Sequence, residues 1–349
     1  MHVCNRCGKL PVQMESCSDV YLTLPTHHHR EGFEAVIQKM NYAYEVIEEG
    51  YLIKRVDFEG FIQYLCDFVF NSVEQKDVMV LAMHCGSKLD FSTLKRYKRL
   101  SDWLSHIHGQ EVMRIIEKGQ IKTLFQPIIH GQTGRIYGYE ALSRGIMSDG
   151  SLMSPEVLFK SAKALDLMFF LDRVCREASL RAAAQQGITQ KLFINFVPTA
   201  IYEPELCLQS TAKVLSDVNL REDQVVFEVV ETEQVEDFSH LNRILDYYRN
   251  KGYSTALDDI GSGYANIEAL LKLKPDYMKI DMDIVRDIHT NLENQRKLDA
   301  FILNGKKIGL TILAEGVETQ DEFEFLKQKG VDLFQGYLFG RPEEVPRKI

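Results

Sequence analysis

Apolar and polar residues alternate along residues 109–349 in a way that predicts short strands separated by helices. Between most of the apolar runs lie roughly 20 to 50 residues of helical pattern. The runs are TLFQPII (123–129), RIYGYEAL (135–142), KLFINF (191–196), QVVFEVVE (224–231), YSTALDD (253–259), YMKID (277–281), LTILAEG (310–316) and DLFQGYLFG (332–340). Because parallel neighbours need a crossover connection, this alternation predicts a parallel sheet. Eight runs predict a closed α/β barrel.

The first two runs depart from this plan. Only HGQTGR (130–135) joins them, a link the size of a hairpin loop. A link this short connects antiparallel strands. The sequence therefore predicts a modified TIM-like (β/α)8 barrel whose first strand is antiparallel to its neighbour.

Residues 1–108 show no repeating plan but carry enough apolar surface for a small domain. Helical spacing runs through 33–47 and 58–69, and 78–82 (VMVLA) has the pattern of a buried strand. A further helix over 92–104 would be capped by its first serine. We predict a small mixed α/β domain that ends at 108 and serves as a regulatory or sensory region.

Composition and charge argue against two classes of protein, those that bind DNA over a broad basic surface and those that span a membrane. The 349 residues carry a net charge of -9 with a pI near 5.6, which disfavours a broad electrostatic surface for DNA. No apolar run reaches the roughly 18 residues of a membrane span, and the N-terminus lacks the apolar core of a signal peptide. We expect a cytoplasmic protein without a membrane segment.

The N-terminus holds a candidate structural zinc site. Cys4 and Cys7 have the spacing of a zinc knuckle, and Cys17 and His27 supply two further ligands. A second CxxC or HxxxH pair is missing, so the alternative is a set of surface thiols beside a polar histidine loop.

The cysteine count argues against a disulfide framework. The chain has seven cysteines, an odd number, scattered through a sequence expected in the cytoplasm. Four of them lie in apolar patterns and are expected to be packing residues: Cys66, Cys85, Cys175 and Cys207.

Seven of the eight strand-like runs of the barrel carry a polar residue near their end. These residues are Glu140, Asn195, Glu228, Asp258, Lys279, Glu315 and Gln335. Carboxyl ends of barrel strands meet at one face, so these side chains are expected to converge there. Four carboxylates in one place repel unless cations neutralise them, and oxygen ligands suit Mg²⁺ or Mn²⁺. The alternative is that they are solvated residues at strand ends.

Two adjacent acids, Asp258 and Asp259, raise a question of geometry. Successive side chains on a strand point to opposite faces, so both can face one site only if the strand ends between them. Gly261 and Gly263 permit such a turn. Asp258 would then bind one cation, and Asp259 would bind a second cation or bridge both. Two cations are the usual arrangement for phosphodiester cleavage. The alternative is that Asp259 caps the next helix.

Together these motifs resemble the EAL family of bacterial phosphodiesterases acting on cyclic di-GMP. The resemblance covers about 115–345 and rests on motifs in the family's order: FQPII, YEALSR, KLFINF, FEVVETE, ALDDIGSGYANI, KPDYMKID, ILAEGVET and FQGYLFGRP. The departures are mild, with Ile260, Ser262 and Ala265 where the family usually has Phe, Thr and Ser. None of them removes a predicted ligand.

The resemblance implies roles for individual residues. Those implied for the metal site are Glu140, Asn195, Glu228 and Asp258 for a first cation and Asp259 for a second. The catalytic residues would be Lys279, Glu315, Asp258 and Glu231. Of these, Lys279 would orient the attacking water or contact the phosphate, and Glu315 would be the general base. Glu231 would hold the DDIGSGYAN loop in place. The substrate-binding residues would be Gln126, Arg144, Gln335 and Glu318.

The function implied by the resemblance is hydrolysis of cyclic di-GMP to linear pGpG with two Mg²⁺ or Mn²⁺ ions per active site. A homodimer formed through the EAL domain is also expected by resemblance. One alternative is a catalytically silent cyclic di-GMP receptor or protein-interaction module, and another is an unrelated metal-dependent barrel enzyme. The chain carries no GGDEF-type signature, so no cyclase activity is expected.

Overall fold

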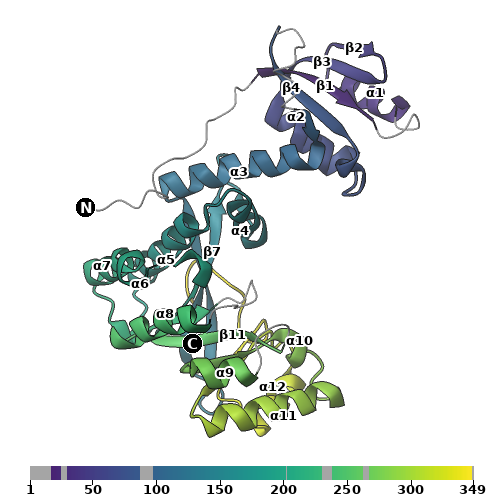
Figure 1. Cartoon of the computed structure of the whole chain (residues 1–349). Helices are drawn as coiled ribbons and strands as arrows, with labels where there is room; N and C mark the ends of the chain where they lie inside the picture. Colours follow the sequence, from purple (N-terminus) through teal and green to yellow (C-terminus); the bar gives the residue numbers. More distant parts are fainter. Residues whose placement is uncertain are drawn as a thin grey trace. The chain divides into compact units, whose positions relative to one another are not determined.

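The chain, represented by a computed structural model, divides into two compact units (Figure 1). One comprises residues 1–114 and 160–165, and the other 115–159 and 166–349. The predicted domain boundary falls inside helix α3 (Leu100–Lys118) and stays a prediction. The structure describes residues 17–24, 30–86, 97–201, 203–229, 238–261 and 267–347.

The N-terminal unit contains an antiparallel five-stranded sheet in the order β2-β3-β1-β4-β5. Its elements are β1 (Cys17–Thr23), α1 (Arg30–Lys39), β2 (Tyr44–Ile47), β3 (Gly50–Asp57), α2 (Phe58–Tyr64), a π-helical segment (Leu65–Val69), β4 (Met79–His84) and β5 (Tyr97–Arg99). Apolar residues of the strands and helices form one core, in which the buried Trp103 indole donates to the Val80 carbonyl at 3.0 Å. The predicted small α/β region is confirmed.

Two of its predicted helices were placed wrongly. The helix predicted over 33–47 stops at Lys39, and the left-handed φ of +59° at Asn41 turns the chain away from the helix. Residues 44–47 instead pair with β3, so their apolar spacing reflects a strand. Residues 97–99 likewise form β5 rather than a helix, and α3 begins at Leu100.

The predictions for the cysteines in apolar patterns are confirmed for three residues and wrong for one. Cys175 is buried, and Cys66 and Cys207 are partly buried against the cores, so these three are packing residues as expected. Cys85 was wrongly expected to pack, because it is disulfide-bonded. Its apolar run ends at Met83, strand β4 ends at His84, and Cys85 itself is exposed.

All eight predicted barrel strands are present and close on one another. The strands are β6 (Ile121–His130), β7 (Ile136–Ile146), β9 (Lys191–Phe196), β10 (Val225–Val229), β11 (Ser254–Ile260), β12 (Tyr277–Ile280), β13 (Thr311–Ala314) and β14 (Leu333–Gln335). Strand β6 pairs antiparallel with both β7 and β14, whereas the other neighbours in the ring are parallel. The antiparallel first strand is therefore confirmed. A short extra strand, β8 (Leu152–Met153), pairs with β7 and was not predicted.

Helices surround the barrel (Figure 1). Helix α4 (Pro155–Ala164) is divided between the two units. The helices that lie wholly in the barrel unit are α5 (Met168–Gln185), α6 (Pro204–Cys207), α7 (Gln209–Val218), α8 (Phe238–Asn250), α9 (Ile267–Leu273), α10 (Met282–Val285), α11 (Leu292–Lys307) and α12 (Gln320–Gln328). Their apolar faces and the outward strand residues form the main core. None of the helices in the described part of the chain has the length and apolarity of a membrane span.

The barrel interior is built in layers. One layer is apolar and takes a residue from most strands: Ile128, Phe193, Val226, Ala256, Tyr277, Leu313 and Leu333. Because side chains repeat every two residues along a strand, the next inward position lies one layer higher. That position holds a polar residue on each of these strands, so the strand period alone places a polar layer above the apolar one.

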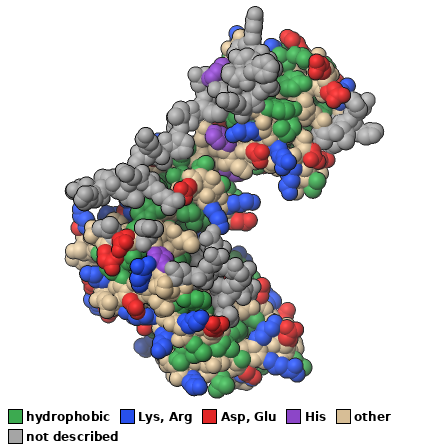
Figure 2. All heavy atoms as spheres, in the orientation of Figure 1, with side chains coloured by type: hydrophobic (Ala, Val, Ile, Leu, Met, Phe, Trp, Pro, Cys, Tyr) green, Lys and Arg blue, Asp and Glu red, His purple; other side chains and the backbone are tan. Residues whose placement is uncertain are grey.

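Surface charge is mixed on the side of the molecule that Figure 2 presents. Lys and Arg side chains lie among Asp and Glu side chains over the described residues there. The described residues also form solvent-exposed ion pairs, such as Lys329 with Asp299 at 2.7 Å. Such pairs add little stability, about 0 to 1 kcal/mol each.

Candidate active site

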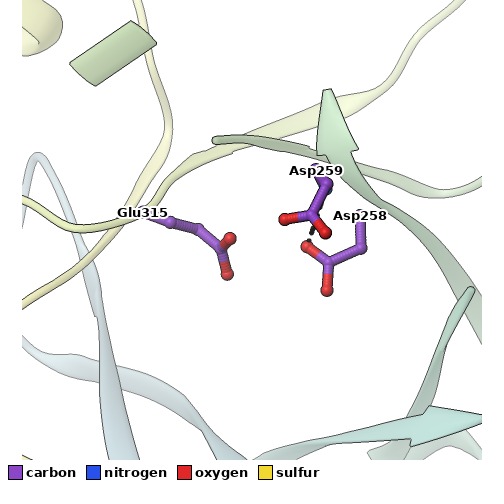
Figure 3. A group of neighbouring side chains, drawn as sticks. All are labelled: Asp258, Asp259 and Glu315. Atoms are coloured by element: carbon purple, nitrogen blue, oxygen red, sulfur yellow. Dashed lines mark hydrogen bonds between the residues drawn. The ribbon is translucent and has the colours of Figure 1, made fainter. Parts of the chain in front are cut away.

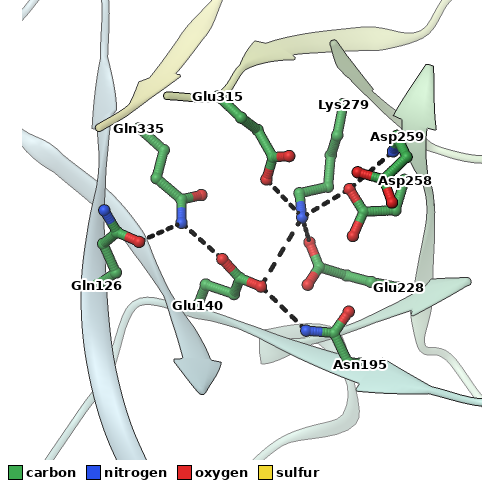
Figure 4. Close-up of polar contacts among 9 residues, drawn as sticks. All are labelled: Gln126, Glu140, Asn195, Glu228, Asp258, Asp259, Lys279, Glu315 and Gln335. Atoms are coloured by element: carbon green, nitrogen blue, oxygen red, sulfur yellow. Dashed lines mark hydrogen bonds and ion pairs between the residues drawn. The ribbon is translucent and has the colours of Figure 1, made fainter. Parts of the chain in front are cut away.

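The polar layer gathers around the buried side chain of Lys279 (Figure 4). Its Nζ lies 2.6 Å from Glu315 Oε1, 2.8 Å from Glu228 Oε1 and 3.0 Å from Asp258 Oδ1. Glu140 Oε1 lies further away, at 3.9 Å. Strands β7, β10, β11 and β12 and the end of β13 thus bring four acids to one ammonium group.

Glu140 is also the centre of a set of amide contacts. Asn195 Nδ2 donates to Glu140 Oε1 at 2.9 Å, and Gln335 Nε2 donates to Glu140 Oε2 at 2.6 Å. Gln335 Nε2 also donates to Gln126 Oε1 at 3.0 Å. Gln126 and Glu140 are partners in the β6–β7 register, which places them side by side. These contacts link the two predicted substrate residues to the predicted metal site.

Asp258, Asp259 and Glu315 form a compact group of carboxylates (Figure 3). One oxygen from each residue lies within 4.8 Å of the others, a spacing that would hold a cation. The prediction that the strand ends between the two aspartates is wrong. Strand β11 runs on to Ile260.

A β-bulge at this point instead allows the two adjacent aspartates to face the same site. The register between β11 and β12 shifts between Leu257 and Ile260, and Asp259 has a left-handed φ of +54°. The Asp259 amide donates to Asp258 Oδ1 at 2.9 Å, which fixes the bulge. The left-handed conformation, favoured for Asp among residues other than glycine, turns the second acid toward the site.

Burial and mutual repulsion change the acidity of these groups. Burial, followed by the nearby Glu140 and Asp258, raises the pKa of Glu228 well above its ordinary value against the opposing effect of Lys279. Burial and Asp258 raise the pKa of Asp259 to about 7. Burial alone would lower the pKa of Lys279, but the surrounding acids raise it well above its ordinary value. Ionising all of these acids together is therefore unfavourable unless further positive charge lies beside them.

The oxygen atoms of this layer fit divalent cations. Asn195 Oδ1 and Glu228 Oε2 are buried, and no described residue donates a hydrogen bond to either. Buried acceptors without donors are costly unless something else satisfies them. Carboxylate and amide oxygens are the ligands that Mg²⁺ and Mn²⁺ prefer.

The loops after β13 and β14 pack tightly and position Glu315 and Gln335. Val317 N donates to the Gln335 carbonyl at 3.0 Å. A Cβ at Gly336 would lie 2.0 Å from the Val317 carbonyl oxygen, so only glycine fits there. The buried Glu322 carboxylate accepts from the backbone N–H of Glu318, Thr319 and Asp287 at 2.9 to 3.0 Å, which ties the loop after β13 to the segment after β12.

Some predicted residues lie outside the polar layer. Glu318 forms a two-bond pair with Arg286, at 2.6 and 2.9 Å, rather than contacting the acids. Arg144 is partly buried, donates to the Ser143 carbonyl at 2.9 Å and lies within electrostatic range of Glu140. Glu231 lies outside the described residues. So do Cys4, Cys7 and His27 and the side chain of Cys17, so the zinc prediction stays open.

Comparison with known families decides the assignment. The family model described as "EAL domain" matches residues 110–342. The chain belongs to the EAL domain family.

The EAL domain also resembles curated proteins. The probable cyclic di-GMP phosphodiesterase PdeG of Escherichia coli K12 is 29% identical over 240 residues, covering 67% of this chain and 47% of PdeG. The cyclic di-GMP phosphodiesterase NbdA of Pseudomonas aeruginosa is 27% identical over 239 residues, covering 67% of this chain and 30% of NbdA. The matched region is thus less than half of each relative.

Solved structures share the fold. A standalone versatile EAL protein from Vibrio cholerae O395, in its c-di-GMP bound form, is 36% identical with a TM-score of 0.60, covering 65% of this chain and 94% of that chain. BlrP1 from Klebsiella pneumoniae, in a calcium/cy-diGMP complex, is 22% identical with a TM-score of 0.59, covering 93% of this chain and 96% of that chain. The second likeness concerns the fold alone, but it extends beyond the EAL domain.

Two contacts that shape the EAL domain site could not be predicted from the sequence. The Gly340 carbonyl accepts from Gln126 Nε2 at 3.3 Å, and Glu343 pairs with Phe125 by two backbone hydrogen bonds. The chain after β14 thus holds the middle of β6, which carries Gln126. Backbone acceptors have no side-chain signature. The Arg286 partner of Glu318 was also missed, because a lone arginine in an exposed segment looks like surface charge.

Proposed function

We propose that this chain hydrolyses cyclic di-GMP to linear pGpG in a reaction that depends on two divalent cations, Mg²⁺ or Mn²⁺. The observation that carries the proposal is the group of five acids, one lysine and three amides in a single layer of buried and half-buried side chains (Figure 4). The EAL relatives named as cyclic di-GMP phosphodiesterases support the choice of substrate.

The first cation would be held by Glu140, Asn195, Glu228 and Asp258, whose buried oxygens include two without donors among the described residues. The second would be held by Asp258 and Asp259, which together with Glu315 form the carboxylate group of Figure 3. Bound there, the two cations would lower the pKa of a water molecule and neutralise the phosphodiester.

Other residues of the chain would bind and orient the substrate. Lys279 supplies a fixed positive charge, because three acids within 3.0 Å keep it protonated. Glu315 would accept a proton, since its carboxylate lies beside the two aspartates where the water would attack. Gln126 and Gln335 would contact the nucleotide from the β6 and β14 side, and Arg144 would meet its phosphate or guanine.

A direct assay of the full-length chain tests this proposal. Purified protein is incubated with cyclic di-GMP and Mg²⁺ or Mn²⁺, and the nucleotides are separated by chromatography. We expect pGpG to accumulate, and we expect a chelator to stop its formation. Stable binding of cyclic di-GMP without turnover would instead assign the chain as a receptor, and turnover in excess chelator would contradict the metal dependence.

A further inference from the structure

A buried ion pair on α5 lies outside the polar layer and has no part in the proposed chemistry. Asp172 and Arg176 are 2% and 0% exposed, and they lie one helical turn apart. Arg176 Nε donates to Asp172 Oδ2 at 2.9 Å, and Arg176 Nη2 lies 2.8 Å from the same oxygen. The guanidinium also donates to the Thr211 hydroxyl of α7.

The second oxygen of Asp172 leaves the helix and contacts the barrel. Asp172 Oδ1 accepts from the backbone N–H of Val197 at 2.9 Å. Val197 immediately follows β9, two residues after Asn195. The carboxylate therefore connects α5 to the end of the strand that carries a predicted metal ligand.

The position of Asn195 matters because both the nitrogen and the oxygen of its side-chain amide are used. Its amide nitrogen donates to Glu140 at 2.9 Å, which leaves Oδ1 buried and without a donor among the described residues. A ligand atom must be held to within a fraction of an ångström to bind a cation well. The backbone of β9 sets that position, and its C-terminal end is the part that α5 holds.

Stability alone does not explain a charged pair at this place. Well-packed apolar residues of similar volume often stabilise a core as well as a buried ion pair does. An apolar pair, however, offers no acceptor for the Val197 N–H. Asp172 provides this acceptor, and Arg176 provides the charge that lets the carboxylate be buried.

We propose that Asp172, held by Arg176, is a positioning residue that fixes Asn195 for cation binding. This inference rests on the proposed function, in which Asn195 binds the first cation. It differs from a purely structural role, in which the pair would only join α5 to α7.

Two double variants separate these roles. Asp172→Asn with Arg176→Gln removes both charges but keeps an oxygen for Val197, because the new amide nitrogen can donate to the glutamine. Asp172→Leu with Arg176→Met keeps the packing but removes the acceptor. Thr211→Val is the matched control, since it removes a contact of Arg176 and leaves Asp172 and Val197 joined.

The test measures Mn²⁺ binding to each folded variant by the electron paramagnetic resonance signal of free Mn²⁺. Asn195→Ala identifies which bound Mn²⁺ belongs to the first site, and circular dichroism verifies folding. We expect the Leu/Met variant to bind this Mn²⁺ at least about tenfold more weakly than the wild type, as loss of outer partners of metal ligands does. We expect the Asn/Gln variant and Thr211→Val to stay within about threefold.

Two results would overturn the positioning role alone: a folded Leu/Met variant with wild-type Mn²⁺ affinity, or an Asn/Gln variant that loses as much affinity as the Leu/Met variant. A wild-type protein that binds no Mn²⁺ would overturn the proposed metal site as well. If the Leu/Met variant does not fold, Asp172→Ala with Arg176→Met, which also removes the acceptor, takes its place with the same expectation.

Discussion

Replacing Glu140 with alanine is expected to remove hydrolysis of cyclic di-GMP while the barrel stays folded. Glu140 accepts hydrogen bonds from Asn195 and Gln335 and lies 3.9 Å from Lys279. Its replacement therefore removes the contacts of the polar layer with all three side chains. Loss of an outer partner of a metal ligand already costs about 10- to 100-fold, and Glu140 is a predicted ligand itself. We expect turnover to fall by at least about a hundredfold, measured by nucleotide chromatography.

The conservative variant Glu140→Gln sharpens this prediction. The new amide keeps the shape and one acceptor but lacks the charge, so we expect hydrolysis to be lost here as well. Glu293→Ala is a matched control, because Glu293 is exposed and pairs only with Lys297 on α11 among the described residues. Wild-type turnover in Glu140→Ala would refute the assignment of this layer as the active site.

Replacing Lys279 with methionine is expected to change both stability and activity. Lys279 is 1% exposed and is the shared partner of Glu228, Asp258 and Glu315. Removing one partner from a buried ion pair leaves uncompensated charge and costs about 3–5 kcal/mol. We therefore expect the free energy of unfolding, measured in urea without added metal, to fall by about this amount. We also expect hydrolysis to be lost.

Divalent cations should partly reverse the loss of stability. Mn²⁺ that binds to the acids replaces the missing positive charge, so the increase in melting temperature on adding Mn²⁺ should be larger in Lys279→Met than in the wild type. The control is Lys329→Met, which removes an exposed pair with Asp299 and should change stability by about 0.5 kcal/mol or less. An unchanged free energy of unfolding in Lys279→Met would contradict this prediction, because it would show that the lysine does not stabilise the buried acids.

The barrel and most of its polar layer were predictable because strand periodicity carries the relevant information. Side chains repeat every two residues, so the polar residue at Glu228 follows the buried Val226, and the same step leads from Phe193 to Asn195. The six-residue link before β7 likewise fixed the direction of β6. Both features depend on residues that lie close together in the chain, so they can be predicted from the sequence.

Other features were not predictable because their causes are not local in the sequence. The bulge at Asp259 depends on how β11 pairs with β12, and apolar spacing did not distinguish β2 from a helix. The contact of Asp172 with Val197 joins segments 25 residues apart, and an aspartate–arginine pair on a helix usually lies at the surface. The structure was needed to show that this pair is buried beside β9.

The account depends most on the claim that the polar layer holds two divalent cations. The most direct test is the anomalous scattering of Mn²⁺ in crystals of the full-length chain soaked in that ion. We expect two peaks about 3.5–4 Å apart, one beside Glu140, Asn195 and Glu228 and one beside Asp259 and Glu315, with Asp258 contacting both. An anomalous map with no peak among these residues at saturating Mn²⁺ would contradict the account.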